Sequence, residues 1–194
     1  MNELNDEYWS QRYLQHTDAW DLGEPSPPLK AYIDQLTDKN LRILIPGCGN
    51  AYEAQYLLHK GFKNITLVDI SEVLVAKLQQ QLSGTSIQII HTDFFRFHQQ
   101  QDLILEQTFF CALDPSLRKS YAQHVLSLLA PQGTLAGLLF DAVFESSPPF
   151  GGSKAEYQQL FSPLFHIKTM ETCSNSVEAR QNRELFFILK NKLA

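Results

Sequence analysis

The sequence predicts an α/β fold, a mixed sheet of seven strands with helices on both faces. Strand-like and helix-like runs alternate along most of the chain, which is typical of a parallel sheet. The last two strand-like runs, 165–173 and 183–191, leave no room between them for a helix. We therefore expect these two strands to pair as an antiparallel hairpin.

Continuous or alternating apolar residues locate the other strands. These strands are expected at 41–46, 64–69, 86–91, 102–106 and 133–140. Helical spacing predicts helices at 51–62, 71–82, 115–130 and from 153 onward. Ser71, Asp114 and Ser153 are candidate N-caps, and Gly61 is a candidate helix stop.

The length of 194 residues suits one domain, 1–194, in which a Pro-rich piece separates an N-terminal arm, 1–28, from the body. The formal net charge of -5 argues against non-specific binding to nucleic acid or anionic membranes, and no apolar run could span a bilayer. Three cysteines without metal-ligand spacing suggest reduced thiols in a cytoplasmic protein and no metal site.

Ligands of such sheets bind beyond the carboxyl ends of the strands, so the loops after the strands are the candidate site. The first loop, IPGCGNAYE, carries Gly47, Gly49 and Ala51. Small residues let the backbone approach a ligand closely, and the next helix offers free N–H groups to an anion. Ala51 fits the tight Gly-x-Gly-x-Gly/Ala loop of S-adenosylmethionine enzymes better than the dinucleotide pattern, in which Tyr52 would have to be small. The simpler alternative is a tight strand–helix turn.

Acidic residues follow the second and third strands. Asp69, 22 positions after Gly47, can accept hydrogen bonds from both ribose hydroxyls of a nucleoside. Asp93 can accept from an adenine amino group while the neighbouring ring of Phe94 packs on the base. The alternatives are an N-cap or a solvated charge for Asp69, and a cap beside core phenylalanines for Asp93.

Several segments in the same order resemble the S-adenosylmethionine-dependent methyltransferases of the thiopurine methyltransferase superfamily, most closely its halide/thiol branch. They are RILIPGCGNAYEAQYLLHKGF, LVDIS, TDFF and EQTFFCALDPSLR, together with YWSQRY…TDAWDLGEPSPPL and SSPPFGGSKAEY. The resemblance covers nearly the whole chain. It implies a Rossmann-like class I methyltransferase fold, S-adenosyl-L-methionine as cofactor and a small-molecule methyl acceptor.

The resemblance also implies a cofactor site, carried over residue by residue. Three aromatic positions belong to an arm that folds over the cofactor, and Tyr13 stands where family members commonly have Trp. Glu106 is expected either to face away from the acceptor or to contact the cofactor's ammonium. The cofactor-binding candidates are Trp9, Tyr13, Trp20, Gly47, Gly49, Asp69, Ile70, Asp93, Phe94 and Glu106.

Gln107 marks the main departure from the family pattern. It matches a position beside the transferred methyl that is typically Tyr in the halide/thiol branch and Arg in the thiopurine branch. We assign it the catalytic role, as an N–H donor to the acceptor. A soft nucleophile such as a thiolate, hydrosulfide, halide or related selenium or tellurium compound needs a dry pocket more than a base. Phe109 and Phe144 are the candidate walls of that pocket, and core packing is the alternative.

Other functions share parts of this pattern. A nicotinamide-dependent oxidoreductase would use the glycine loop and Asp69 but leave the aromatic arm without a role. A non-catalytic protein would bind S-adenosylmethionine and transfer nothing. A nucleic-acid or protein methyltransferase would need a recognition domain or a basic surface. We expect a monomer or a weak homodimer.

Overall fold

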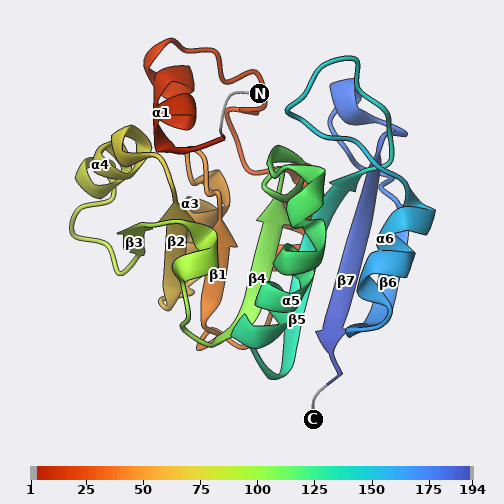
Figure 1. The fold of residues 1–194 in the computed structure, drawn as a ribbon. Coiled ribbons are helices and arrows are strands. Elements are labelled where there is room, and N and C mark those ends of the chain that lie inside the picture. The colour runs from red at the N-terminus through yellow and green to blue at the C-terminus, as the bar shows by residue number, and fades with distance from the viewer. Residues whose placement is uncertain (1–3, 193–194) are drawn as a thin grey trace.

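Seven strands form one mixed sheet in the computed structural model, which describes residues 4–192. Their order across the sheet is β3-β2-β1-β4-β5-β7-β6, so β4 is central (Figure 1). The first five strands run parallel, and β7 lies antiparallel between β5 and β6. The predicted fold class and the terminal hairpin are confirmed. The strands are β1 Ile43–Pro46, β2 Ile65–Asp69, β3 Gln88–His91, β4 Gln101–Gln107, β5 Leu129–Phe140, β6 Phe165–Thr172 and β7 Glu184–Asn191.

Six α-helices of the described residues surround this sheet (Figure 1). Side chains of α2, α3 and α4 join one buried cluster, and side chains of α5 and α6 join a second, so the two groups cover opposite faces. None of these helices is both long and apolar enough to cross a membrane. The helices are α1 Asp6–Leu14, α2 Pro27–Ile33, α3 Tyr52–His59, α4 Glu72–Gln81, α5 Arg118–Leu128 and α6 Lys154–Phe161.

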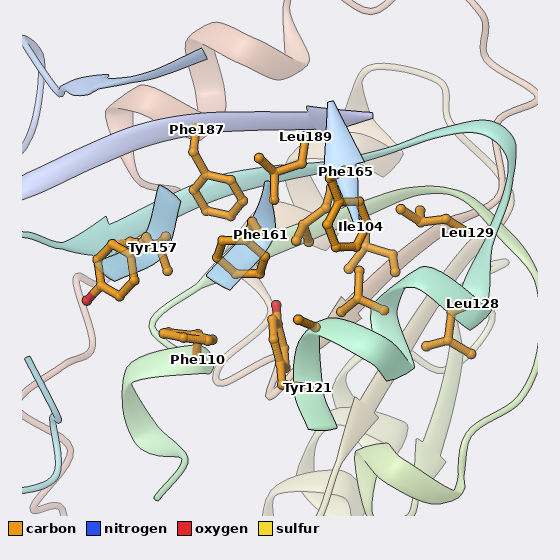
Figure 2. Close-up of a cluster of buried hydrophobic side chains, with 14 of the residues drawn as sticks. Ile104, Phe110, Tyr121, Leu128, Leu129, Tyr157, Phe161, Phe165, Phe187 and Leu189 are labelled. Atoms are coloured by element: carbon orange, nitrogen blue, oxygen red, sulfur yellow. The ribbon is translucent and has the colours of Figure 1, made fainter. Parts of the chain in front are cut away.

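Successive residues of a strand point alternately into the two clusters. Leu44 and Ile104 face α5 and α6, whereas Ile43 and Leu103, their neighbours in the chain, face α2, α3 and α4. Figure 2 shows part of the second cluster, where side chains from α5 and α6 meet those of the strands. Both faces of the sheet are therefore covered by packed apolar side chains, so the polar side chains of a functional site must lie at the ends of the strands.

The predicted helix signals operate as expected. The Ser71 hydroxyl accepts a hydrogen bond from Leu74 N at 3.2 Å, and the Ser153 hydroxyl accepts one from Glu156 N at 3.3 Å. Asp114 accepts from Ser116 N at 2.8 Å. Gly61, at φ +89°, follows the end of α3.

Several element boundaries and one helix differ from the sequence prediction. The predicted helix 115–130 is a 3-10 turn, Pro115–Leu117, followed by α5, which ends at Leu128. The strand predicted from 133 already begins at Leu129, because Asn191 donates to the carbonyls of Leu129 and Ala130 and ties this irregular segment to the sheet. Helix α2 was not predicted, although Ser26 precedes two prolines at its first positions.

Candidate active site

The candidate site lies where the carboxyl ends of β1, β2 and β4 meet. β1 pairs with β2 on one side and with β4 on the other, so the strand order switches direction at β1 (Figure 1). The loops that leave such a switch point diverge and leave room for a ligand. The arm that carries α1 lies over this edge, above the ends of β2 and β3 (Figure 1).

The loop after β1 adopts the backbone shape that its small residues permit. Gly47 and Gly49 have φ of +55° and +50°, and Ala51 has φ of +59°. A Cβ atom at position 47 would also collide with the ring of Phe109, so this position needs glycine for two independent reasons. Helix α3 begins directly afterwards at Tyr52, and its first N–H groups face the same edge of the sheet.

Asp69 ends β2 and is 7% exposed. Its carboxylate accepts hydrogen bonds from Ser71 N, at 2.9 Å, and from the N–H groups of Gly49 and Ile70. Burial raises its pKa to about 6, although these hydrogen bonds and the nearby His91 pull in the opposite direction. The sequence candidates Gly49, Asp69 and Ile70 are thus brought together. A buried carboxylate with a raised pKa is suited to further donors such as sugar hydroxyls.

Asp93 and Phe94 follow β3 as predicted, in the arrangement of the simpler alternative. Asp93 accepts from Phe95 N at 2.9 Å and caps a 3-10 turn, Phe94–Arg96. Phe94 is buried and packs edge-on against Phe109, with ring centroids 5.2 Å apart. A contact of either residue with adenine stays a prediction.

The three aromatic candidates of the arm form one cluster centred on Trp20. The ring centroids of Trp9 and Tyr13 lie 5.5 and 5.9 Å from that of Trp20, both edge-on. Burial, and then the charge of Asp69, raise the pKa of the Tyr13 phenol well above its ordinary value. The arm therefore lies close to the carboxylate at the end of β2.

Polar contacts that the sequence did not predict hold α1 against α4. The hydroxyls of Ser10 and Ser71 lie 2.9 Å apart, and Glu72 N donates to Asp6 at 3.0 Å. Asp6 thus occupies the N-terminus of α4, where a carboxylate is favoured. These residues are 61 and 66 positions apart in the chain, and no local pattern links them.

The end of the arm is held by Asp21 and Arg180. Asp21 accepts from the Asn50 amide and, at 3.2 Å, from the Tyr52 hydroxyl. Arg180 is 9% exposed and donates to the carbonyl of Trp20 at 2.7 Å and to Glu184 at 3.4 Å. Sequence reasoning missed Arg180 because it lies in the loop between β6 and β7, which offers no periodicity to read.

At the end of β4, the adjacent polar side chains of Glu106 and Gln107 lie in different environments. Gln107 is half-buried, and among the described residues its Oε1 atom has no hydrogen-bond partner. Glu106 is 0% exposed, and both carboxylate oxygens accept hydrogen bonds inside the protein. Of the two orientations considered for Glu106, the geometry favours the one that faces away, and a contact with the cofactor's ammonium stays a prediction.

The two candidate wall residues occupy different places. Phe109 is half-buried against Gly47 and Phe94. Phe144 lies in the loop after β5, with its ring 4.9 Å from that of Phe140 and the guanidinium of Arg183 4.8 Å from its centroid. Within residues 4–192 no ring contact joins Phe144 to Phe109. Phe109 therefore lies beside the loop after β1, whereas Phe144 lies in a different loop, the one after β5.

Two hollows of the surface lie away from this edge. One, of about 250 Å³, is lined by residues that include Tyr32, Cys173 and Phe186. The other, of about 420 Å³, is lined by residues that include Arg42, Lys63 and Gln101, around the amino ends of the strands. Neither contains a residue of the candidate site, whose edge is covered by the arm.

Comparison with known proteins decides the family. The model of the thiopurine S-methyltransferase (TPMT) family matches residues 4–193. The chain belongs to this family. It is an S-adenosylmethionine-dependent methyltransferase, and membership of the TPMT family decides against the nicotinamide-dependent alternative.

Curated relatives agree with membership of the TPMT family, and a solved structure agrees with the fold. A probable thiol methyltransferase 2 of Arabidopsis thaliana is 30% identical over 171 residues, which cover 84% of this chain and 75% of the relative. Thiocyanate methyltransferase 1 of the same plant is 23% identical, covering 91% and 81%. The fold resembles the 1,6-didemethyltoxoflavin-N1-methyltransferase of Burkholderia thailandensis, with a TM-score of 0.77 at 16% identity, covering 96% and 86%.

The residues at the carboxyl edge fit S-adenosylmethionine. A backbone loop with left-handed residues adjoins a helix N-terminus, and a buried carboxylate ends the neighbouring strand. The carboxylate has a raised pKa, which donors such as ribose hydroxyls would lower. Within residues 4–192 no group of His, Cys, Asp and Glu is arranged to hold a metal ion.

Proposed function

We propose that this methyltransferase acts on a small, soft nucleophile, foremost a thiol or hydrosulfide, with halides and related selenium or tellurium compounds as further acceptors. When bound, S-adenosylmethionine supplies an electrophilic methyl group on a sulfonium. The task of the chain is then to hold donor and acceptor in line and to exclude water. Such orientation contributes up to about 7–11 kcal/mol to catalysis.

The cofactor residues divide the work in this proposal. Asp69 accepts from the ribose hydroxyls, Asp93 and Phe94 bind the adenine side, and Ile70 packs beside the nucleoside. The loop of Gly47 and Gly49 admits the cofactor close to the backbone. Trp9, Tyr13 and Trp20 close over it, and an aromatic face near a sulfonium contributes about 0.5–2 kcal/mol by cation–π attraction.

One observation supports a soft acceptor: at the end of β4 the neutral amide of Gln107 lies at the strand end, whereas the carboxylate of Glu106 is buried. Glu106 is turned inward with both oxygens engaged, whereas the Gln107 side chain is half-buried at the strand end. Such a site offers a hydrogen-bond donor and no base. Thiols reach the thiolate near neutral pH without a strong base, whereas alcohols and protonated alkyl amines need one. Phe109 and Phe144 exclude water in this proposal.

The wider expectations follow the same reasoning. We propose that residues 1–194 form a single methyltransferase domain and that the arm 1–28 acts as its lid. The three cysteines are free and buried, which suits a reducing, cytoplasmic location. We propose a monomer or weak homodimer that binds a small acceptor and neither nucleic acid nor membrane.

A panel of acceptors tests the proposal. Purified protein is incubated with S-adenosylmethionine and, separately, hydrosulfide, an aryl thiol, thiocyanate, iodide, a thiopurine or selenite, with phenol and benzylamine as hard controls. S-adenosylhomocysteine should form with at least one sulfur acceptor and not with the controls. Turnover confined to phenol or benzylamine would refute the soft-acceptor assignment. Cofactor binding without turnover on any compound would favour the non-catalytic alternative.

A further inference from the structure

Glu106 is a buried carboxylate that the chemistry proposed above leaves without a role. It is the second-to-last residue of β4 and is 0% exposed. Its Oε1 atom accepts hydrogen bonds from both Phe109 N and Phe110 N, each at 2.8 Å. Its Oε2 atom accepts from the Tyr121 hydroxyl at 2.8 Å. One side chain thus binds two consecutive amides of the following turn through one oxygen and a tyrosine hydroxyl of α5 through the other.

The turn that Glu106 holds is one that its own residues would not readily adopt. Thr108 has φ of +61°, in the left-handed region that residues other than glycine rarely occupy. Only Thr108 and Phe109 separate the end of β4 at Gln107 from the 3-10 turn that begins at Phe110. A residue held in such a conformation persists only where its surroundings fix it, and the carboxylate supplies two of the fixing contacts.

The same turn places the residues on which the proposed reaction depends. Gln107 precedes Thr108 at the strand end, and Phe109 follows it with its ring against Gly47. The ring of Phe109 also packs on Phe94 at 5.2 Å. A shift of the turn would therefore move the acceptor-side amide and the wall of the cofactor loop together.

The neighbouring strand is shaped to accommodate Glu106. Gly137 of β5 lies directly opposite Glu106 in the parallel register. A Cβ atom at position 137 would collide with the backbone oxygen and the Cβ atom of Glu106. From the other side, Tyr121 points from α5 toward the sheet (Figure 2). Gly137 thus leaves room for the backbone of Glu106, and the Tyr121 hydroxyl occupies the carboxylate oxygen that the turn amides do not use.

We propose that Glu106 is a positioning residue for methyl transfer, whose carboxylate holds the Thr108 turn so that Gln107 and Phe109 face the reacting groups. The proposal rests on the acceptor site described under the proposed function. Glu106 touches neither cofactor nor acceptor in this account. It acts through the two amides that it binds.

Three variants separate positioning from general stability. Glu106→Met keeps the length of the side chain and removes the acceptor atoms. Glu106→Gln keeps a carbonyl oxygen for the two amides. Tyr121→Phe is the matched control, because it removes a buried hydrogen bond of the same carboxylate and leaves the amide contacts of the turn in place. If Glu106→Met does not fold, Glu106→Asp replaces it, because a carboxylate shorter by one methylene no longer reaches both amides.

The measurements are kcat and KM for the best sulfur acceptor, the cofactor Kd by calorimetry, the unfolding temperature, and amide hydrogen exchange at 107–111. Displacement by about 1 Å can cost about 100-fold in rate, so Glu106→Met should lower kcat by about 10- to 100-fold. Its cofactor Kd should change much less, and exchange at Phe109 and Phe110 should accelerate. Glu106→Gln should restore most of the activity, and Tyr121→Phe should keep it even where its unfolding temperature falls as far.

Two outcomes would overturn the proposal. The first is an unchanged kcat in Glu106→Met, and the second is a loss of kcat in Tyr121→Phe as large as that in Glu106→Met at equal loss of unfolding temperature. If the wild type methylates no sulfur acceptor, the proposed function is refuted independently of Glu106. Hydrogen exchange then tests only whether Glu106 holds the turn. In that case, unchanged exchange at Phe109 and Phe110 in Glu106→Met refutes its hold on the turn, and faster exchange supports it.

Discussion

Asp69 connects three parts of the site at the scale of a single residue. Its carboxylate binds the loop after β1 through Gly49 and the start of α4 through Ser71, and its charge reaches Tyr13 of the arm. Burial holds its pKa at about 6 in the ligand-free protein. Ligand hydroxyls that donate to the carboxylate favour its ionised form and lower this pKa on binding.

The raised pKa of Asp69 predicts that cofactor binding depends on pH. Below about pH 6 the free protein must lose a proton from Asp69 to bind, so affinity should fall, by up to about tenfold per pH unit. Calorimetry of S-adenosylmethionine binding between pH 5 and 8 measures this, with proton release expected near pH 6. Asp69→Asn should bind weakly with a flatter profile. An equally steep profile in Asp69→Asn would assign the titration to another group.

Gln107 should separate turnover from cofactor affinity. Its amide lies at the acceptor side in our account, so Gln107→Ala should lower kcat by about tenfold, as expected for loss of one hydrogen bond to a charged group. The Kd for S-adenosylmethionine should stay within a small factor. Steady-state kinetics and calorimetry on the same preparation check both. A large change in Kd with unchanged kcat would instead place Gln107 in the cofactor site.

The arm is the element that differs most from a simple packed helix. Its three aromatic rings pack on one another, and its contacts with the body include the hydrogen bond between Ser10 and Ser71, the N-cap of α4, and that between Arg180 and the Trp20 carbonyl. Adjacent Tyr8 and Trp9 serve different partners: Tyr8 accepts a hydrogen bond from Arg12 at 2.8 Å, and Trp9 packs on Trp20. Such a docked but polar attachment suits a lid that opens for ligand exchange.

Removing the centre of the aromatic cluster should weaken cofactor binding. Trp20→Ala deletes both edge-on ring contacts, each worth about 0.5–1.5 kcal/mol, so the Kd should rise by about tenfold. Leu14→Ala is the matched control, because Leu14 lies on the same arm and is 56% exposed. Calorimetry measures both variants. Similar Kd values for wild type and Trp20→Ala would show that the cluster only docks the arm.

The elements show what the sequence could and could not reveal. Strands and caps were predicted well because they depend on neighbours in the chain: apolar runs for β1, β2 and β4, and serine hydroxyls for α4 and α6. The early start of β5 was missed because the distant Asn191 stabilises it. Glu106 accepts a hydrogen bond from Tyr121, 15 positions away, and Arg180 donates to the Trp20 carbonyl across 160 positions. Contacts of this kind have no local signal.

At the scale of the whole molecule, the buried carboxylate of Glu106 makes the stability of the fold depend on pH. Burial raises the pKa of Glu106 to about 7 from its ordinary value of 4.5, despite the hydrogen bonds of Phe110, Tyr121 and Phe109. Between these two values the folded state binds more protons than the unfolded state at this residue. Its contribution to stability is therefore full below about pH 4.5 and is lost as pH rises through about 7.

A comparison of unfolding free energies at several pH values tests this contribution of Glu106. From pH 5 to pH 8 the Glu106 contribution should decline by an amount on the order of 3 kcal/mol. Urea unfolding of wild type and Glu106→Gln across this range isolates it, since the other titrating groups are common to both. The difference between the two proteins should shift in favour of Glu106→Gln as pH rises. A difference independent of pH would mean that Glu106 keeps an ordinary pKa.

Transfer of a labelled methyl group tests the central claim most directly, namely that the edge formed by β1, β2 and β4 carries methyl from S-adenosylmethionine to sulfur. The protein is incubated with S-adenosylmethionine bearing a CD₃ group and with hydrosulfide or an aryl thiol, and products are measured by mass spectrometry. We predict a methylated sulfur product that keeps the intact CD₃ group, formed in equal amount with S-adenosylhomocysteine and strongly reduced in Asp69→Ala. Tight cofactor binding without any labelled sulfur product would contradict the account.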